Sequence, residues 1–166
     1  QMIHTSAGIG TLKAESAGAF VAALNDHVSF VAHAERLSLA NAAQLFANYD
    51  LILDGTDNFG TRAIAAEAAR AAGLPLVSGA VSMFDGQVTV FAPGGPGFTD
   101  LYPTTPDEAD LPACEVVGVL GAVTGVIGTL MAMEAIKLIT GLGEPLIGRL
   151  LLYDGRAARF DEMRYA

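Results

Sequence analysis

The stretch that decides the fold reads Asp50-Leu-Ile-Leu-Asp-Gly-Thr-Asp-Asn-Phe-Gly-Thr-Arg62. Residues 51–53 form a short apolar run, which is typical of a strand buried on both faces of a parallel sheet. Two carboxylates, Asp54 and Asp57, follow the run, and a helical pattern then extends over residues 59–72. The stretch therefore predicts a strand, a short polar loop and a helix.

The polar loop has a functional and a purely structural interpretation. In parallel α/β sheets, ligands gather at the carboxyl ends of the strands. Asp54 and Asp57, beside a helix N-terminus, can hold a hydrated metal ion that carries phosphates. Alternatively, Asp57 only caps the helix, since Thr56, Asp57 and Asn58 are all good N-cap residues, and Asp54 only bonds the backbone. The loop alone leaves both interpretations open.

The rest of the chain is typical of an α/β domain. We expect helices over 11–25 and 38–46, strands over 27–36, 75–80 and 87–92, a turn over 83–86, and a hairpin of 150–154 with 158–164. The sequence thus predicts a Rossmann-like, mostly parallel sheet flanked by helices, with an antiparallel C-terminal hairpin. At 166 residues, the chain is expected to form a single domain over 1–166.

Composition excludes several classes of protein. The formal net charge is −9 and only two lysines occur, so the basic stripe that nucleic-acid binding needs is absent. A single cysteine, Cys114, excludes an internal disulfide and a CxxC pair for zinc. The three histidines have no metal-site spacing, and no signal peptide is expected. The sequence therefore predicts neither a nucleic-acid partner nor a metal site built from His and Cys.

Lys13 and Cys114 each have a functional and a purely structural interpretation. Lys13 lies in the first turn of the first predicted helix, where a cation opposes the helix dipole unless it meets an anion. It is either a phosphate contact or a solvated lysine. Cys114 ends a proline-rich loop over 92–115, ahead of a helix, and is either a nucleophile or a buried, inert thiol.

A segment without charge, over 116–133, follows that loop. Its length would just reach across a bilayer. Glu134 and Lys137 continue the same helical pattern, however, and glycines recur along it, which lets another helix or a sheet approach closely. We therefore expect a central buried helix or a dimer-interface helix rather than a membrane span.

Several short motifs stand in order along essentially the whole chain. They are residues 54–62, Ser78-Gly-Ala80 with Gly86-Gln87, Pro112-Ala-Cys-Glu115 with Gly118-Val-Leu-Gly121, and Glu134-Ala-Ile-Lys137 with residues 143–146 and 148–150. This series resembles the ThiF/MoeB/HesA family of ubiquitin-activating-like adenylyltransferases. Members of this family join AMP from ATP to the C-terminal glycine of a small ubiquitin-like sulfur carrier and release pyrophosphate.

The resemblance implies cofactors, partners and a place of action. It implies ATP and magnesium as cofactors, a sulfur-carrier protein as the partner, and a molybdopterin, thiamine or related sulfur-transfer pathway. It also implies a homodimer in the cytoplasm, with no nucleic-acid or membrane partner.

The resemblance also assigns roles to single residues near the polar loop. Asp57 would hold magnesium and Lys13 would touch the phosphates, and Asp54 and Asn58 join these two as the expected cofactor-binding residues. Arg62 is expected to help position the tail of the carrier.

A third catalytic candidate besides Asp57 and Lys13 is Cys114. It matches a cysteine that takes part in sulfur or thioester chemistry in some members of the family and is dispensable in others. The proline-rich segment before it resembles the crossover loop of the family, under which the carrier tail threads.

Two departures from the family pattern limit what the chain contains. Many members hold zinc with two CxxC pairs, but the first pair would fall at Gly97 and Asp100, where no cysteine occurs. The N-terminal third of the family, with the glycine-rich loop that cradles ATP, has no counterpart, because Gly8-Ile-Gly10 has no strand before it. We therefore expect the C-terminal two-thirds of a ThiF-type domain.

Two alternative functions remain open. A non-catalytic carrier-binding half would need a partner chain to supply the nucleotide site. The distal half of an NAD-dependent dehydrogenase would show a similar α/β pattern. A dehydrogenase should also present a His or Lys general base near the cofactor, and the sequence places none there convincingly.

We predict that the protein purifies without stoichiometric zinc. A structural zinc site needs about four ligands, and the chain has one cysteine. Elemental analysis of the purified protein measures the metal content directly. One zinc per chain, retained after dialysis, would contradict this prediction.

Overall fold

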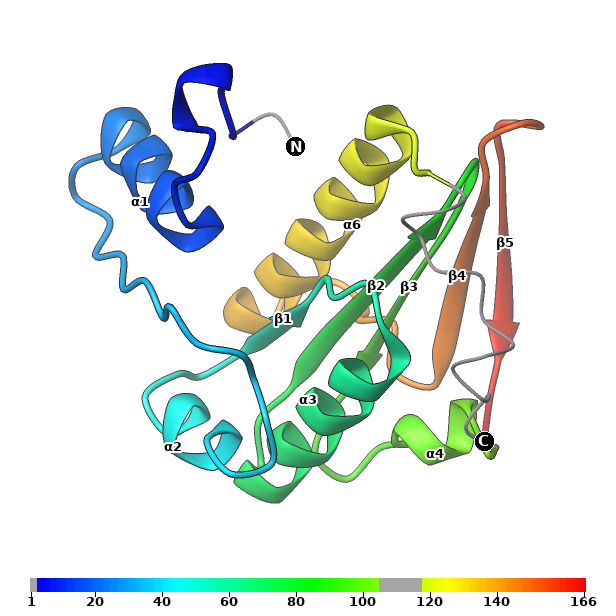
Figure 1. The fold of residues 1–166 in the computed structure, drawn as a ribbon. Coiled ribbons are helices and arrows are strands. Elements are labelled where there is room, and N and C mark those ends of the chain that lie inside the picture. The colour runs from blue at the N-terminus through cyan, green and yellow to red at the C-terminus, as the bar shows by residue number, and fades with distance from the viewer. Residues whose placement is uncertain (1–2, 105–117) are drawn as a thin grey trace. The chain divides into compact units, whose positions relative to one another are not determined.

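The computed structural model describes residues 3–104 and 118–166 (Figure 1). The chain divides into two compact units, residues 1–36 and residues 37–166. The predicted strand, polar loop and helix over residues 50–72 all belong to the second unit.

The N-terminal unit contains a 3-10 helix, η1 (Ser6–Gly8), and the predicted first helix, α1 (Lys13–Leu24). The strand that we expected over 27–36 is wrong, because these residues have no regular secondary structure. An alternating pattern forms a strand only where a neighbouring strand takes up its backbone hydrogen bonds, and the described part of this unit contains no strand. Instead, the ring of Phe30 lies against Gly18 of α1, where a Cβ atom would come within 2.9 Å of it.

The second unit is built on a five-stranded sheet in the order β1-β2-β3-β4-β5. Its strands are β1 (Ile52–Asp54), β2 (Leu76–Ser82), β3 (Asp85–Phe91), β4 (Arg149–Asp154) and β5 (Arg159–Arg164). β1 is parallel to β2, whereas all the other neighbouring pairs are antiparallel. The prediction of a mostly parallel sheet is therefore wrong, and the predicted C-terminal hairpin is confirmed as β4 and β5.

The link between β2 and β3 explains why these two strands are antiparallel. Only Met83 and Phe84 lie between the paired residues Ser82 and Asp85. A link this short can only reverse the chain, because a parallel crossover needs about a dozen residues or more. The turn is also two residues shorter than expected, since the last two predicted turn residues already pair in β3.

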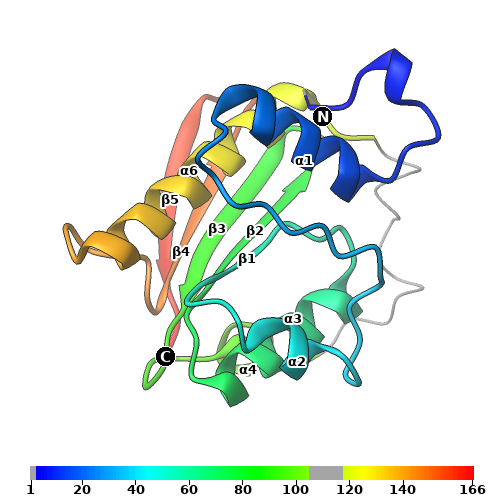
Figure 2. The same ribbon diagram turned by 90° about the vertical axis from the view of Figure 1, so that its left-hand side faces the viewer.

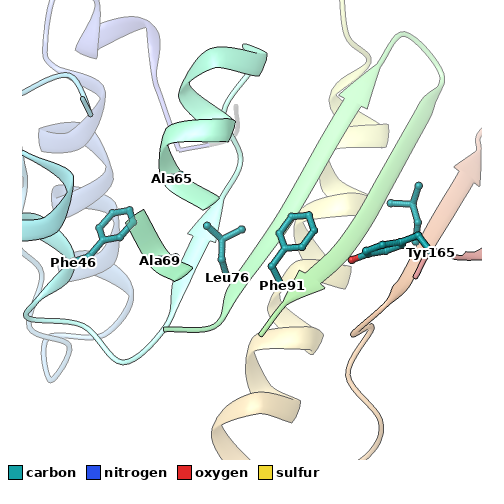
Figure 3. Packing of buried hydrophobic residues seen from close by; sticks show 7 residues of the cluster. Phe46, Ala65, Ala69, Leu76, Phe91 and Tyr165 are labelled. Carbon is teal, nitrogen blue, oxygen red and sulfur yellow. The ribbon is translucent and has the colours of Figure 1, made fainter. Parts of the chain in front are cut away.

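Helices cover both faces of this sheet. They are α2 (Ala42–Phe46), α3 (Phe59–Ala72) and α4 (Phe98–Leu101) on one side, and α6 (Gly121–Thr140) on the other (Figure 2). Successive residues of β2 face opposite ways, as the pleat of a strand requires. Leu76 packs in a core with α3, next to Phe91 (Figure 3), and Val77 packs in a second core with α6.

α6 confirms the predicted long apolar helix, but only one of its faces is buried. By length and composition alone it could cross a membrane, and 28% of an apolar 18-residue stretch of the helix is buried within the protein. The buried face packs Ile127 and Met131 onto Gly79 of β2 and Gly86 of β3, where a Cβ atom would collide with them. Large side chains on the rest of the helix are exposed, namely Met133, Ile136 and Ile139.

Aromatic side chains order the described part of the predicted proline-rich loop. The ring of Phe98 in α4 lies 5.2 Å from Phe59, 5.9 Å from Phe91 and 4.9 Å from Tyr102, measured between centroids. This cluster ties α4 to the start of α3 and to β3.

Glu134 joins the C-terminal half of α6 to the loop before β4. Its side chain is buried, Oε2 accepts a hydrogen bond from the Leu146 N–H at 2.9 Å, and Oε1 pairs with Lys137. Lys137 also donates to the carbonyl oxygen of Glu144 at 2.9 Å. These two charged residues in the C-terminal half of α6 thus hold the following loop in place.

We predict that Glu134→Leu lowers the free energy of unfolding by about 2 kcal/mol, because the buried Leu146 N–H and the Lys137 ammonium both lose an acceptor. Glu144→Gln is the matched control and should change stability by less than about 0.5 kcal/mol, since only the backbone of Glu144 takes part. Urea unfolding measures both values. Equal stabilities of the two variants would contradict the role of Glu134.

Candidate functional site

The loop over 55–58 leaves the sheet at Asp54, the last residue of β1. The Asp54 side chain is buried, and both of its oxygens are engaged. Oδ1 accepts hydrogen bonds from the Thr56 N–H at 2.9 Å and from the Thr56 hydroxyl at 2.7 Å. Oδ2 accepts one from the hydroxyl of Ser78, its register partner on β2, at 3.0 Å. Asp54 therefore fixes the start of the loop against the neighbouring strand.

Arg62, in the first turn of α3, forms a buried charge pair with Asp54. Its Nε lies 3.3 Å from Asp54 Oδ2, and the two side chains are 10% and 1% exposed. Its Nη2 donates to the carbonyl oxygens of Thr56 and of Gly79, the latter at 3.3 Å. Among the described residues the Nε–H has no aligned hydrogen-bond acceptor, so its contact with Asp54 is one of charge. A buried charge is costly unless it is paired, so this pair holds α3 against the end of β1.

The residue that caps α3 determines whether the Asp57 carboxylate is engaged by the helix. Asn58 is the N-cap of α3, and its Oδ1 accepts a hydrogen bond from the Thr61 N–H at 2.8 Å. The interpretation of Asp57 as only a helix cap is therefore wrong. The Asp57 carboxylate is exposed, with the Asn58 amide at 3.4 Å from its Oδ1. It stands ahead of α3, where the partial positive charge of a helix N-terminus favours anions.

Magnesium fits the donors that this loop presents. Magnesium is usually bound through one or two carboxylates together with water and substrate phosphates, and Asp57 offers one exposed carboxylate. Within residues 3–104 and 118–166, no three His, Cys, Asp or Glu side chains gather as a metal cage. A magnesium ion at Asp57 would therefore need further ligands, such as phosphate oxygens.

Tyr102, which follows α4, belongs to the same network, although no sequence motif pointed to it. Its hydroxyl accepts a hydrogen bond from the Gln87 side-chain amide and interacts with the guanidinium of Arg62. Burial raises the pKa of the Tyr102 hydroxyl above its ordinary value, and the charge of Arg62 partly offsets this rise. The hydroxyl is thus protonated at neutral pH.

The structure brings together four of the six predicted site residues. Asp54, Asp57, Asn58 and Arg62 lie in the β1–α3 region of the second unit. Lys13 is the exposed first residue of α1 in the N-terminal unit, and Cys114 lies outside the described residues. With both carboxylate oxygens of Asp54 engaged by protein groups, its direct contact with a cofactor stays a prediction.

The second unit contains two hollows on other parts of its surface than the residues at Asp57. One of about 590 Å³ lies between α3 and residues 92–103, and another of about 420 Å³ is lined by β2, β3, β4 and β5. Asp57 lines neither of them, and the residue is exposed in the described structure.

Comparison with known proteins finds relatives along the whole chain. The family model of the ThiF family matches residues 1–166. The probable adenylyltransferase/sulfurtransferase MoeZ of Mycobacterium tuberculosis is 48% identical over 159 residues, covering 93% of this chain and 41% of MoeZ. The SAMP-activating enzyme E1 of Haloferax volcanii is 41% identical over 165 residues, covering 99% of this chain and 61% of that enzyme.

A third relative is the sulfur carrier protein adenylyltransferase of Thermus thermophilus. It is 41% identical over 169 residues, covering 98% of this chain and 62% of the relative. The chain therefore spans 41–62% of the length of these curated relatives.

Solved structures share the fold at low sequence identity. Escherichia coli MccB, crystallised with ATP, has a TM-score of 0.79 at 15% identity. The matched region covers 99% of this chain and 51% of MccB. PaaA has a TM-score of 0.76 at 15% identity, covering 99% of this chain and 58% of PaaA. The mixed sheet flanked by helices is thus the fold of these proteins.

We predict that Asp54→Ala and Asp57→Ala differ sharply in stability. Asp54→Ala leaves the Arg62 charge buried without its partner and should lower the free energy of unfolding by about 3–5 kcal/mol. Asp57→Ala removes an exposed carboxylate that caps nothing and should change it by less than about 0.5 kcal/mol. Urea unfolding of both variants tests the contrast, and a small effect of Asp54→Ala would contradict it.

Proposed function

Because this chain belongs to the ThiF family, we propose that the protein uses ATP to adenylylate the C-terminal glycine of a small ubiquitin-like sulfur carrier. The names of the relatives support this proposal, since they include an adenylyltransferase/sulfurtransferase, a SAMP-activating E1 and a sulfur carrier protein adenylyltransferase. The structural observation that carries it is Asp57, an exposed carboxylate at a helix N-terminus on a loop anchored at both ends.

In the proposed reaction, a carboxylate oxygen of the carrier's terminal glycine attacks the α-phosphorus of ATP. An oxygen–phosphorus bond forms, the bond from the α-phosphorus to the bridging oxygen breaks, and pyrophosphate leaves with that electron pair. The free carboxylate is a poor electrophile, and the resulting acyl adenylate carries AMP as a good leaving group. Phosphoryl transfer of this kind depends on positioning and on charge stabilisation rather than on covalent help from the protein.

The residues of the β1–α3 region would have separate roles in this reaction. Asp57 would hold a magnesium ion, and a bound magnesium ion would supply positive charge at the phosphates. Asn58 would fix the start of α3, whose N-terminal N–H groups favour an anion. We assign Lys13 to the phosphates by family resemblance, as a second source of positive charge.

Cys114 belongs to a different step of the proposal. Formation of the acyl adenylate needs no thiol, because the only bonds that change are those at the α-phosphorus. We therefore place any role of Cys114 in a later sulfur-transfer or thioester step. The alternative function, a non-catalytic carrier-binding half, differs from our proposal in that it would bind the carrier without turning over ATP.

We predict that Asp57→Asn lowers carrier-dependent exchange of pyrophosphate into ATP about 100-fold, equivalent to about 2.7 kcal/mol of transition-state stabilisation. The fold should remain intact, because Asp57 is exposed and Asn58 supplies the helix cap. The assay uses the full-length protein with a sulfur carrier from the same genome.

The matched control is Asp50→Asn, which removes an exposed carboxylate from the other end of β1. This variant should exchange pyrophosphate at the wild-type rate. Exchange by Asp57→Asn at that same rate would refute the role of Asp57. Carrier binding without any exchange by the wild-type protein would instead support the non-catalytic half.

A further inference from the structure

We propose that Arg62 is a positioning residue that fixes the Asp57 loop and does not itself touch the carrier or ATP. The role of the loop in catalysis rests on the proposed function, whereas the fixing of the loop by Arg62 does not. Sequence resemblance assigned Arg62 to the carrier tail, and the contacts of its guanidinium point to a different role.

The guanidinium of Arg62 is committed to protein groups on several elements. Counted over all its atoms, the residue Arg62 is 8% exposed. It faces Asp54 at the end of β1 and donates to the carbonyl oxygens of Thr56 in the loop and Gly79 in β2. It also interacts with the hydroxyl of Tyr102 beyond α4. A side chain held in this way is not available to grip a mobile peptide.

The contact with Thr56 acts directly on Asp57. The carbonyl group of Thr56 and the amide nitrogen of Asp57 belong to the same planar peptide unit, so fixing that oxygen fixes the plane. The N–H and hydroxyl of Thr56 are held by Asp54, which is itself paired with Arg62. The carbonyl oxygen of Thr56 therefore depends on Arg62 directly, and its N–H and hydroxyl depend on Arg62 through Asp54. Asn58 anchors the other end of the loop.

A lysine could not make these contacts at once. The guanidinium is a planar group with five N–H donors in a fixed fork, whereas an ammonium is a compact point charge on a flexible stem. Arg62→Lys would retain a positive charge near Asp54 while losing part of the fork that reaches Thr56 and Gly79. The variant thus separates charge from geometry.

The first experiment measures the loop itself, independently of any activity. The N–H of Thr56 donates a hydrogen bond to Asp54. Its amide hydrogen exchange should become about tenfold faster in Arg62→Lys, because the loop opens more often. Arg70→Lys is the matched control, since Arg70 is an exposed residue in the last turn of the same helix, at the end opposite the loop. It should leave the exchange of Thr56 unchanged. Unchanged exchange in Arg62→Lys would overturn the proposal.

The second experiment is a double-mutant cycle in carrier-dependent pyrophosphate exchange. Arg62→Lys should lower kcat about tenfold and leave the KM for the carrier unchanged, because it disturbs Asp57 and not the carrier tail. In the Asp57→Asn background it should cause little further loss, since two residues that act through one another are not additive. A raised KM for the carrier, or losses that multiply in the double variant, would overturn the proposal.

A third variant covers the case in which Arg62→Lys does not fold. Tyr102→Phe removes a single hydroxyl that interacts with Arg62 and keeps the aromatic ring in its cluster. It should raise the exchange rate of the Thr56 amide and lower kcat with an unchanged KM, both less than Arg62→Lys, and no change in either quantity would count against the proposal. Absence of pyrophosphate exchange in the wild type would refute the proposed function alone, because amide exchange still tests the positioning.

Discussion

A buried carboxylate must be paired and hydrogen-bonded, because an isolated charge in the interior is costly. Asp54 meets this requirement with the guanidinium of Arg62 and the hydroxyls of Ser78 and Thr56. Each of these partners comes from a different piece of the second unit, so one charge orders the end of β1, the neighbouring strand, the loop and the start of α3. The candidate site takes its position from this charge and not from its own exposed residues.

The features of the fold that depend on local sequence were predictable, and those that depend on distant partners were not. The apolar run at 51–53 and the helical pattern at 59–72 became β1 and α3, because pattern and capping act over a few residues. The prediction that this strand is buried on both faces is wrong, since Leu53 is half exposed in the second unit. The direction of β3 is set by a two-residue link, whereas the sequence predicted a longer turn over residues 83–86. The residues at 27–36 alternate like a strand, yet alternation cannot supply the neighbouring strand that would pair with them.

The same distinction holds within the site. Three successive residues of the loop can each cap a helix, and the sequence offers no way to choose among them. Only the geometry shows that Asn58 accepts the Thr61 N–H, which leaves Asp57 exposed. Tyr102 escaped notice because it reaches Arg62 through space, from a segment whose prolines and glycines indicate only a loop. The sequence thus identified the region of the site, while the division into buried support and exposed carboxylate required coordinates.

Gly79 takes part in two contacts at once, one with α6 and one with Arg62. On one face, Met131 of α6 occupies the space that a side chain at this position would need. At the same residue, the backbone carbonyl accepts a hydrogen bond from Arg62. A side chain here would force either Met131 to shift or β2 to move away from α6, and a movement of β2 would displace the acceptor of Arg62. The tight interior and the ordered loop therefore both depend on this one residue, and a substitution that moves β2 disturbs both.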